Sequence, residues 1–243
     1  MPDIVISEFM DQAAVDGLAA GFDVLYDPGL ASRPADLAVL IAGARGLIVR
    51  NRTLVRAALL KAAPGLLVVG RLGVGLDNID LEACRAREIE VCPATGANDA
   101  AVAEYVIAAA LILLRGSYFA SAEVIGGSWP RRSCIGREIG GKCLGLIGFG
   151  GIARLTAAHA RALGMVVAAH DPFVAADDPA WDGVRRLDMA DLLATGDVIS
   201  LHVPLIDGTR GLIGAEAVGA MKKGAILINT SRGGIVDEAA LAT

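Results

Sequence analysis

Short apolar runs alternate with segments of helical periodicity along the first part of the chain. Each run has the length of a buried strand, and each intervening segment repeats its apolar residues every three or four positions. The predicted strands are residues 4–7, 23–26, 46–50, 66–70 and 90–92, and the predicted helices are residues 11–20, 35–42, 54–63 and 81–87. This alternation predicts a mostly parallel sheet with right-handed helical crossovers.

A second series of the same kind begins near Lys142. Its predicted strands are residues 144–148, 166–170, 184–187, 198–201 and 225–229, with a helix over residues 152–163 after the first of them. Parallel strands that are buried on both faces by helices are typical of doubly wound α/β proteins. We therefore expect an α/β fold with two doubly wound parallel-sheet units, one over residues 1–98 and one over residues 128–243.

The longest apolar stretch, residues 100–114, lies between these two units and is interrupted only by Glu104. It is too short to span a bilayer. We interpret it as a helix buried on nearly all sides, between domains or subunits. Asn98 or Asp99 can cap its N-terminus, and a turn-rich connector over residues 126–132 follows. Residues 99–127 are therefore predicted to form connecting or dimer helices.

Charge and cysteine content narrow the classes of function. With a net charge of −5, the chain lacks the excess of positive charge that typically indicates binding to nucleic acid or an anionic membrane. The four cysteines include no C-x-x-C pair, so they indicate neither a disulfide framework nor a zinc site, and they fit a reducing compartment. The N-terminus reads as a strand and lacks the charged region and long apolar core of a signal peptide. We expect a cytoplasmic protein without nucleic-acid, membrane or metal partners.

The most informative segment is the G-x-G-x-x-A turn over residues 148–153, between an apolar strand and a helix. Gly148 permits the tight turn, Gly150 lets backbone N–H groups approach a pyrophosphate, and the small Ala153 lets the helix pack on the strand. Asp171 follows the next apolar strand, where a carboxylate accepts hydrogen bonds from a ribose diol. The combination predicts a dinucleotide site. The alternative is a glycine turn in an ordinary α/β domain.

Several further blocks, together with this turn, resemble the D-isomer-specific 2-hydroxyacid dehydrogenases, and most of all their phosphoglycerate dehydrogenase branch. The blocks are residues 46–53, 70–80, 98–105, 136–142, 201–205 and 221–237. The resemblance covers nearly the whole chain. It implies an outer substrate domain of flavodoxin-like topology and an inner Rossmann NAD-binding domain inserted into it, with catalysis in the cleft.

The resemblance also implies substrate-binding residues. Gly73, Val74 and Gly75 would bring backbone N–H groups to the substrate carboxylate, a role that glycine suits because it lets the main chain approach a ligand; the alternative is a plain strand-to-helix turn. Arg232 matches the family's catalytic arginine, whose planar fork can hold the carboxylate and polarise the carbonyl of a 2-keto acid. The alternative for Arg232 is a surface arginine.

Arg50 and Arg52 follow the third predicted strand, where the resemblance implies a clamp for a second anionic group. Such a clamp would suit a phosphorylated or sulfonated three-carbon hydroxy acid. Two solvated arginines at a helix entry are an equal alternative.

On the cofactor side, Gly151 and Ile152 match positions whose backbone meets the pyrophosphate. Asp171 matches the adenosine-ribose anchor, and its negative charge would repel a 2′-phosphate, so NAD is preferred over NADP. Further matches lie in two loops that pass the cofactor after their strands: His202, Val203, Pro204, Thr230 and Ser231. His202 would line the cofactor or pack internally rather than act as a general acid, because the family's catalytic histidine belongs to a later segment.

The family's acid–base pair is a histidine oriented by a glutamate, downstream of the catalytic arginine. The chain ends at Thr243 before either residue. His159 and His170 cannot replace that histidine, because one lies on the helix after the glycine turn and the other lies beside the ribose acid. We therefore expect a truncated portion of a dehydrogenase that binds NAD but turns over poorly.

These features together predict an NAD-dependent oxidoreductase. It would interconvert a D-2-hydroxy acid and its 2-keto acid by hydride transfer, as a homodimer. Phosphohydroxypyruvate, sulfopyruvate, glyoxylate and hydroxypyruvate all remain open as substrates. The alternative is a non-catalytic NAD(H)-binding regulatory protein, since the family resemblance extends to transcriptional corepressors; Arg232 favours the enzyme.

Overall fold

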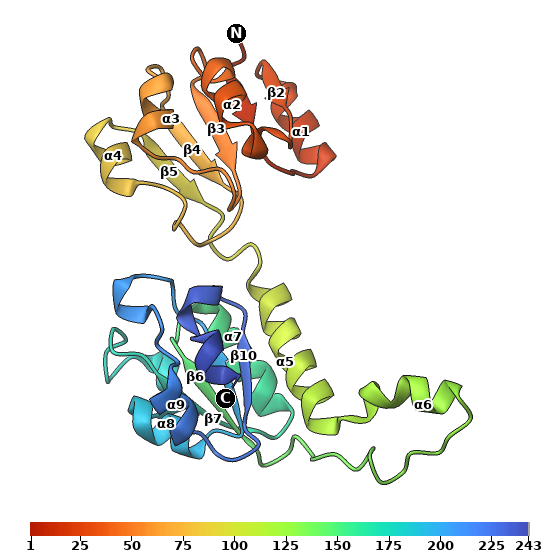
Figure 1. The fold of residues 1–243 in the computed structure, drawn as a ribbon. Coiled ribbons are helices and arrows are strands. Elements are labelled where there is room, and N and C mark those ends of the chain that lie inside the picture. The colour runs from red at the N-terminus through yellow and green to blue at the C-terminus, as the bar shows by residue number, and fades with distance from the viewer. Residues whose placement is uncertain (243) are drawn as a thin grey trace. The chain divides into compact units, whose positions relative to one another are not determined.

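The computed structural model describes residues 1–242, and the chain divides into two compact units, Met1–Ala97 and Asn98–Thr243 (Figure 1). Each unit contains one five-stranded sheet in which all neighbouring strands are parallel. The expected α/β fold with two doubly wound parallel-sheet units is confirmed.

Unit 1 has the strand order β2-β1-β3-β4-β5, which is the flavodoxin-like order. Its strands are β1 (Ile4–Ile6), β2 (Val24–Tyr26), β3 (Gly46–Val49), β4 (Val68–Arg71) and β5 (Glu90–Pro93). Its helices are α1 (Gln12–Ala19), α2 (Pro34–Leu40), α3 (Ala57–Ala62) and α4 (Leu81–Ala86), with a 3₁₀ turn at Leu30–Ser32. The predicted elements of this unit therefore all form, with ends that differ by a few residues.

The core of unit 1 lies between the central strands and the helices on them. Val5, Leu47 and Val69 are fully buried in the sheet and belong to one apolar cluster with Leu37 of α2 and Leu60 of α3. Burial of this kind contributes roughly 1.5–3 kcal/mol for each large apolar side chain. The packing of helices on the sheet leaves the carboxyl ends of the strands free to carry polar loops.

Helix α3 begins later than the sequence predicts, at Ala57 rather than residue 54. Val55 instead forms an isolated parallel bridge with Ile79. Its N–H donates to the Asn78 carbonyl and its carbonyl accepts from the Asp80 N–H, both at 2.9 Å. Because these hydrogen bonds hold residue 55 in an extended conformation, the helix cannot include it.

Unit 2 has the strand order β10-β9-β6-β7-β8. Read from β8, with the strands numbered 1 to 5 from β6, this is the 3-2-1-4-5 order of a Rossmann sheet. Its strands are β6 (Cys143–Ile147), β7 (Val166–His170), β8 (Arg185–Arg186), β9 (Val198–Leu201) and β10 (Ile226–Asn229). Its helices are α5 (Asp99–Arg115), α6 (Ser121–Ile125), α7 (Gly151–Ala162), α8 (Met189–Thr195), α9 (Ala215–Ala220) and α10 (Glu238–Leu241). The order reverses between β6 and β9, and ligands bind at such a switch point in open α/β sheets.

Helix α5 belongs to unit 2 and packs against α7. It buries one face, formed by Ala103, Val106, Ala110 and Leu114. Tyr105 on another face is exposed, so within the chain the predicted burial on nearly all sides is wrong. Asn98, one of the two residues predicted to cap the helix, occupies the N-cap position but makes no side-chain capping hydrogen bond.

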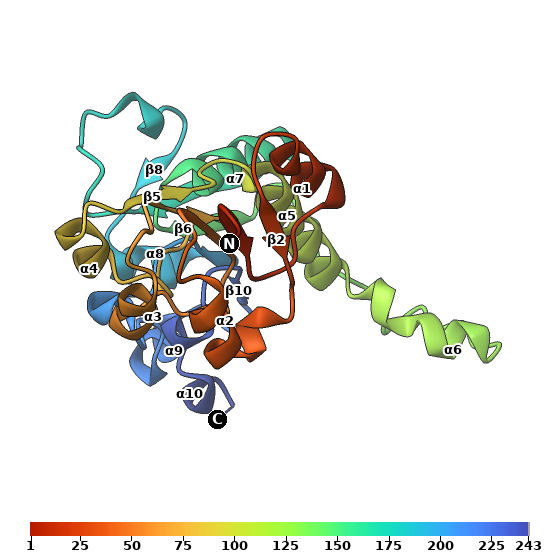
Figure 2. The ribbon, with the colours of Figure 1, turned by 90° about the horizontal axis from the view of Figure 1, so that it is seen from above.

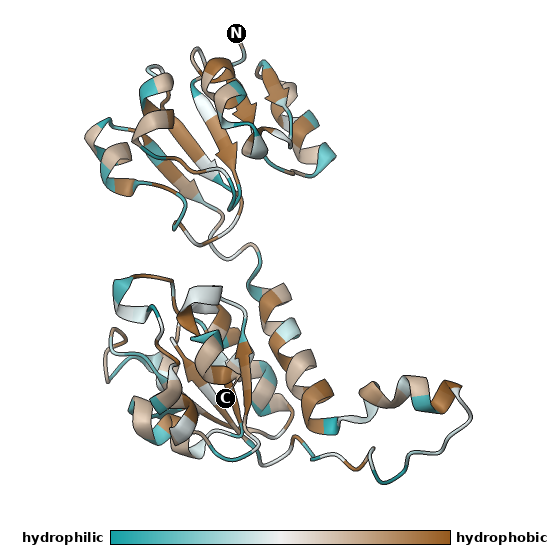
Figure 3. Ribbon diagram, in the orientation of Figure 1, coloured by the Kyte–Doolittle hydropathy of each residue, from teal (hydrophilic) through white to brown (hydrophobic). Residues whose placement is uncertain are grey.

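An extended segment follows α5, and we call residues 117–135 the arm. It contains a 3₁₀ turn, helix α6 and a loop, and it projects away from the rest of unit 2 in two perpendicular views (Figures 1 and 2). Figure 3 colours much of α5 and the ends of α6 as hydrophobic. No single described helix has the length and apolarity to cross a membrane; only the pair Asp99–Arg115 and Ser117–Ile125, bent by 67°, reaches them together.

Candidate functional site

Gly148 directly follows strand β6 and starts the glycine turn with a φ of +86°. A Cβ there would lie 2.7 Å from the His202 carbonyl oxygen and 2.9 Å from Val203 Cγ1. The Gly148 N–H donates to the His170 carbonyl at 2.9 Å, and the His202 N–H donates to the Ile147 carbonyl at 2.7 Å. The turn is therefore held between the ends of β7 and β9, in a space that only glycine fits.

Gly150 is the N-cap residue of the twelve-residue helix α7 and offers no side-chain capping bond. A Cβ at Gly150 would meet nothing within 4 Å. A helix N-terminus with open space before it and no side-chain cap suits a pyrophosphate, which can accept its N–H groups. The residues present therefore fit a dinucleotide, and Ile152 lies in the same first turn.

Gly151 is crowded for a different reason. A Cβ at Gly151 would lie 2.5 Å from the Asp99 Oδ2 atom, at the start of α5. No local pattern indicates this acid beside the N-terminus of α7, because the two residues are far apart along the chain.

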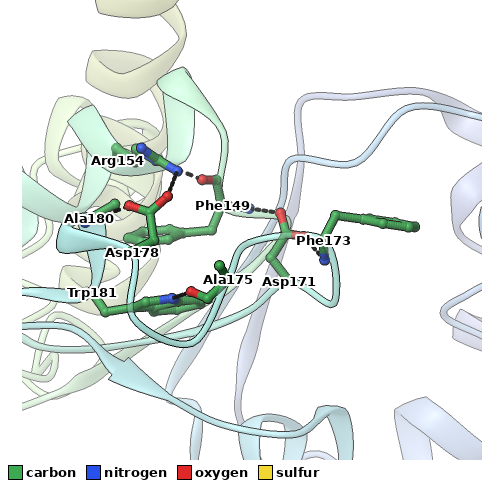
Figure 4. Close-up of polar contacts among 8 residues, drawn as sticks. All are labelled: Phe149, Arg154, Asp171, Phe173, Ala175, Asp178, Ala180 and Trp181. Carbon is green, nitrogen blue, oxygen red and sulfur yellow. Dashed lines mark hydrogen bonds and ion pairs between the residues drawn. The ribbon is translucent and has the colours of Figure 1, made fainter.

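Asp171 follows β7 and is hydrogen-bonded on both oxygens to nearby backbone (Figure 4). Its Oδ2 accepts from the Phe149 N–H at 2.8 Å and its Oδ1 accepts from the Phe173 N–H at 2.9 Å. Each carboxylate oxygen has a second acceptor site. The carboxylate is thus fixed against the glycine turn while retaining the capacity to accept from ribose hydroxyls.

The loop after Asp171 is fastened to the glycine turn by aromatic and ionic contacts that sequence reasoning missed. The Phe149 ring is buried and stacks on Trp181, with ring centroids 4.8 Å apart (Figure 4). Arg154 donates from Nε to the Phe149 carbonyl at 2.9 Å and pairs with Asp178 at 3.7 Å. Phe173, 92% exposed, is free to contact a flat ligand beside the carboxylate.

His202 lies in the loop after β9, with its side chain mostly buried. Its Nε2 is 3.0 Å from the Ser200 hydroxyl. Burial lowers the pKa of His202 to about 4, so the ring is neutral at pH 7. A neutral, hydrogen-bonded ring on the loop beside the glycine turn supports the interpretation that His202 packs internally or lines the cofactor. Pro204 follows in the same loop.

Replacing His202 with glutamine is expected to reduce the sensitivity of the fold to mild acid. In the unfolded chain the ring has its ordinary pKa of 6.5, whereas in the folded chain the pKa is about 4. Between these values the unfolded state binds a proton that the folded state does not, so stability falls as pH falls from 6.5 toward 4, by about 2–3 kcal/mol. Urea unfolding at pH 7 and pH 5 measures most of this loss, about 2 kcal/mol. The His159→Gln control should retain it.

The loop after β10 is tied to the end of β9. The Ser231 hydroxyl donates to the Leu201 carbonyl at 2.9 Å, and the Ser231 N–H donates to Asn229 Oδ1 at 3.0 Å. Asn229 Nδ2 in turn donates to the Arg232 carbonyl at 2.7 Å, and Arg232 Nη1 donates to the Ser231 carbonyl at 2.9 Å. Thr230 and the half-buried Arg232 therefore follow the carboxyl end of a parallel strand in the same sheet as the glycine turn.

In unit 1, the predicted substrate loop follows β4. Gly73 has a φ of +144°, and a Cβ there would overlap Arg71 Nη1. Arg71 is buried and donates from Nη1 to the Leu72 carbonyl at 3.0 Å. Gly73, the first residue of this loop, thus lies directly against a buried guanidinium that the sequence analysis did not single out.

Arg50 and Arg52 follow β3 and both residues are exposed. Arg52 Nη2 donates to the Ser32 hydroxyl at 2.6 Å. The Arg50 guanidinium lies 6.0 Å from the centroid of the exposed Phe9 ring. The two arginines, the hydroxyl and the ring therefore gather at the carboxyl end of the unit 1 sheet.

Comparison with known proteins gives a consistent result. The family model described as D-isomer specific 2-hydroxyacid dehydrogenase, NAD binding domain, matches residues 107–243. The (S)-sulfolactate dehydrogenase of Chromohalobacter salexigens is 55% identical over 243 residues, which are 100% of this chain and 79% of that protein. The D-3-phosphoglycerate dehydrogenase of Mycobacterium tuberculosis is 40% identical over 242 residues, which are 100% of this chain and 46% of that protein.

Solved structures agree with these relatives. The TT0316 protein of Thermus thermophilus superposes with a TM-score of 0.89 at 34% identity, covering 98% of this chain and 76% of that one. The D-lactate dehydrogenase of Aquifex aeolicus, complexed with NAD and lactic acid, gives a TM-score of 0.86 at 28% identity and covers 98% and 72%.

Proposed function

We propose that this chain, which belongs to the D-isomer specific 2-hydroxyacid dehydrogenase family, acts on a three-carbon 2-hydroxy acid that carries a sulfonate as a second anionic group. Family membership makes it an NAD-dependent oxidoreductase that acts on a CH–OH group. When bound, NAD accepts the hydride from the hydroxy acid or, reduced, returns it to the keto acid. Residue roles and the identity of the acid are the proposal.

The observation that carries this proposal is the pair of exposed arginines after β3. Arg50 and Arg52 present two planar guanidinium groups at the carboxyl end of a parallel sheet, beside the Ser32 hydroxyl. Guanidinium groups match the oxygen geometry of sulfonate and phosphate and bind them through paired hydrogen bonds. The high identity to a sulfolactate dehydrogenase over the whole chain supports sulfonate over phosphate.

The other roles follow from position and chemistry. We propose that the backbone of Gly73, Val74 and Gly75 binds the substrate carboxylate, and that Arg232 polarises the carbonyl as negative charge develops on its oxygen. On the cofactor side, we propose that the turn over residues 148–152 binds the pyrophosphate, that Asp171 binds the adenosine ribose, and that the loops over residues 202–204 and 230–231 line the rest of the cofactor.

The test of the substrate is a panel of keto acids. The protein that contains this chain is assayed for NADH consumption with sulfopyruvate, phosphohydroxypyruvate, hydroxypyruvate and glyoxylate. We expect kcat/KM to be highest for sulfopyruvate, and the Arg50→Ala/Arg52→Ala variant to lose that advantage while its activity on glyoxylate changes little. Equal kcat/KM for sulfopyruvate and glyoxylate would refute the proposal. Binding of NADH without reduction of any acid would favour the regulatory alternative.

We also propose that the chain forms a homodimer through the arm. A monomer rarely exposes so many large apolar side chains on one projecting segment. Those of the arm are Tyr118, Phe119, Val124, Ile125, Trp129 and Ile135. A second copy can cover them symmetrically. We place this assembly in the cytoplasm, where a reducing pool suits the four free cysteines.

Placing aspartate at Ile125 and serine at Trp129 is expected to convert the dimer to a monomer. The reason is that both side chains are more than 80% exposed in the single chain and would be buried in the dimer. Light scattering coupled to size exclusion measures the molar mass. Val39→Asp, which changes an exposed apolar residue of unit 1, should leave the dimer intact. A monomeric wild-type chain at micromolar concentration would contradict the proposal.

A further inference from the structure

We propose that Glu8 is a positioning residue whose buried carboxylate holds the loop of residues 50–53, which we call the arginine loop, in the conformation that presents Arg50 and Arg52 to the second anionic group of the substrate. This inference rests on the proposed function above. It adds a residue that neither carries substrate contacts itself nor belongs to the cofactor turn.

The first observation is a convergence of backbone donors. Glu8 follows strand β1 and is only 4% exposed. Its Oε1 accepts from the Arg50 N–H at 2.8 Å and from the Thr53 N–H at 2.9 Å, and its Oε2 accepts from the Arg52 N–H at 3.1 Å. Backbone N–H groups that converge in this way form an anion-binding concavity. In this chain the protein's own carboxylate fills it.

The second observation is that the carbonyl groups of the same loop are held from another element. Asn78, buried after β4, donates from Nδ2 to the Arg50 carbonyl at 3.0 Å and to the Thr53 carbonyl at 2.8 Å. The hydroxyls of Ser7 and Thr53 are 2.9 Å apart and both are buried. The arginine loop is thus fixed by buried polar partners on two sides, and its geometry depends on them rather than on apolar packing.

The charge state of Glu8 fits this role. Burial raises the pKa of Glu8, but the backbone hydrogen bonds from Thr53, Arg50 and Arg52 outweigh it, and the pKa lies below its ordinary value. The carboxylate is therefore ionised at neutral pH and accepts all of these hydrogen bonds at once. Charge-assisted bonds of this kind are shorter and stronger than neutral ones.

The consequence is preorganisation. A long arginine side chain loses conformational freedom on binding, and a loop that is already fixed reduces the additional loss. Glu8 binds the backbone of both arginine residues. It therefore fixes the main-chain positions from which the two side chains extend, and it leaves their guanidinium groups available for the substrate. A neutral residue at position 8 should therefore weaken binding of acids with a second anionic group, and leave simpler acids almost unaffected.

The experiment uses binding to the NADH complex, since a hydroxy acid cannot transfer a hydride to the reduced cofactor. Sulfolactate and glycolate are titrated by calorimetry into wild type, Glu8→Gln and the control Glu90→Gln, an exposed acid on strand β5. We expect Glu8→Gln to weaken sulfolactate binding by about tenfold, with glycolate and NADH changed less than about twofold. Glu90→Gln should match wild type.

Two further variants keep the test decisive. Glu8→Asp retains the charge on a shorter side chain; it should fold and give an intermediate loss for sulfolactate. The Arg50→Ala/Arg52→Ala variant reports on the proposed function itself. If that variant loses no sulfolactate affinity, the proposed clamp is wrong. Suppose instead that the Arg50→Ala/Arg52→Ala variant does lose sulfolactate affinity. The positioning role of Glu8 is then wrong if Glu8→Gln and Glu8→Asp both bind sulfolactate as wild type does. It is also wrong if both variants bind sulfolactate and glycolate more weakly by the same factor.

Discussion

Replacing Gly148 with alanine should abolish measurable NADH binding and lower the free energy of unfolding by about 2–5 kcal/mol. The backbone at Gly148 is in the left-handed region, at a φ of +86°, and the new Cβ would lie 2.7 Å from the His202 carbonyl oxygen. That oxygen belongs to the backbone of a loop that is itself hydrogen-bonded to β6, so it cannot move aside cheaply. The turn must open, and its N–H groups lose their common direction.

The neighbouring glycine separates the effect on binding from the effect on folding. A Cβ at Gly150 meets nothing within 4 Å in the protein, so Gly150→Ala should unfold as wild type does. It should still weaken NADH binding by about 10–100-fold, because the methyl group would occupy the space proposed for the pyrophosphate at the start of the helix. Calorimetric titration with NADH and urea unfolding measure the two quantities.

Gly219 supplies the matched control. It lies within helix α9, where a Cβ meets nothing within 4 Å, so Gly219→Ala should leave NADH affinity unchanged and stabilise the helix slightly. Wild-type stability and wild-type NADH affinity in Gly148→Ala would mean that the turn does not bind the cofactor.

The second large effect is expected at Arg232. Arg232→Leu should lower kcat/KM for the keto acid by about 10²–10³, with NADH affinity changed less than about twofold. Arg232 follows β10 on a loop that Asn229 and Ser231 fix. The hydrogen bond from the Asn229 side chain to the Arg232 carbonyl involves only the backbone of residue 232, so it remains after the substitution. The loss should therefore reflect chemistry at the side chain rather than collapse of the loop.

Lysine at this position distinguishes charge from geometry. Arg232→Lys retains the charge but not the planar fork, so it should recover less than about a tenth of the lost kcat/KM. Steady-state NADH consumption by the protein that contains this chain provides the measurement, and Arg185→Leu on the exposed edge strand β8 is the control. If Arg232→Leu retained the wild-type kcat/KM, the proposed catalytic role of Arg232 would be wrong.

Periodicity and the glycine turn predicted most of the fold. Strands buried on both faces are nearly continuous apolar runs, so β6, β7 and β9 were readable directly, and the parallel order followed from the helices between them. Ends of elements were less readable. Residues 54–56 have helical composition, but the hydrogen bonds of Val55 to another loop decide their conformation, and no local pattern contains that information.

The candidate site divides in the same way. Gly148, Gly150 and Asp171 could be predicted because their spacing is set by one strand, one helix and one turn. The acids Glu8 and Asp99 could not, since each contacts a segment that is distant along the chain. An acid directly after the first predicted strand was the one available sequence signal for Glu8.

The stacking of Trp181 on Phe149 gives the protein an intrinsic optical probe. The indole touches the ring of the residue between Gly148 and Gly150, so its emission should follow cofactor occupancy. The chain has one other tryptophan, Trp129, which is exposed on the arm. A variant that keeps only Trp181 would report coenzyme binding by its fluorescence, and a variant that keeps only Trp129 would report association of subunits. Neither measurement needs a label.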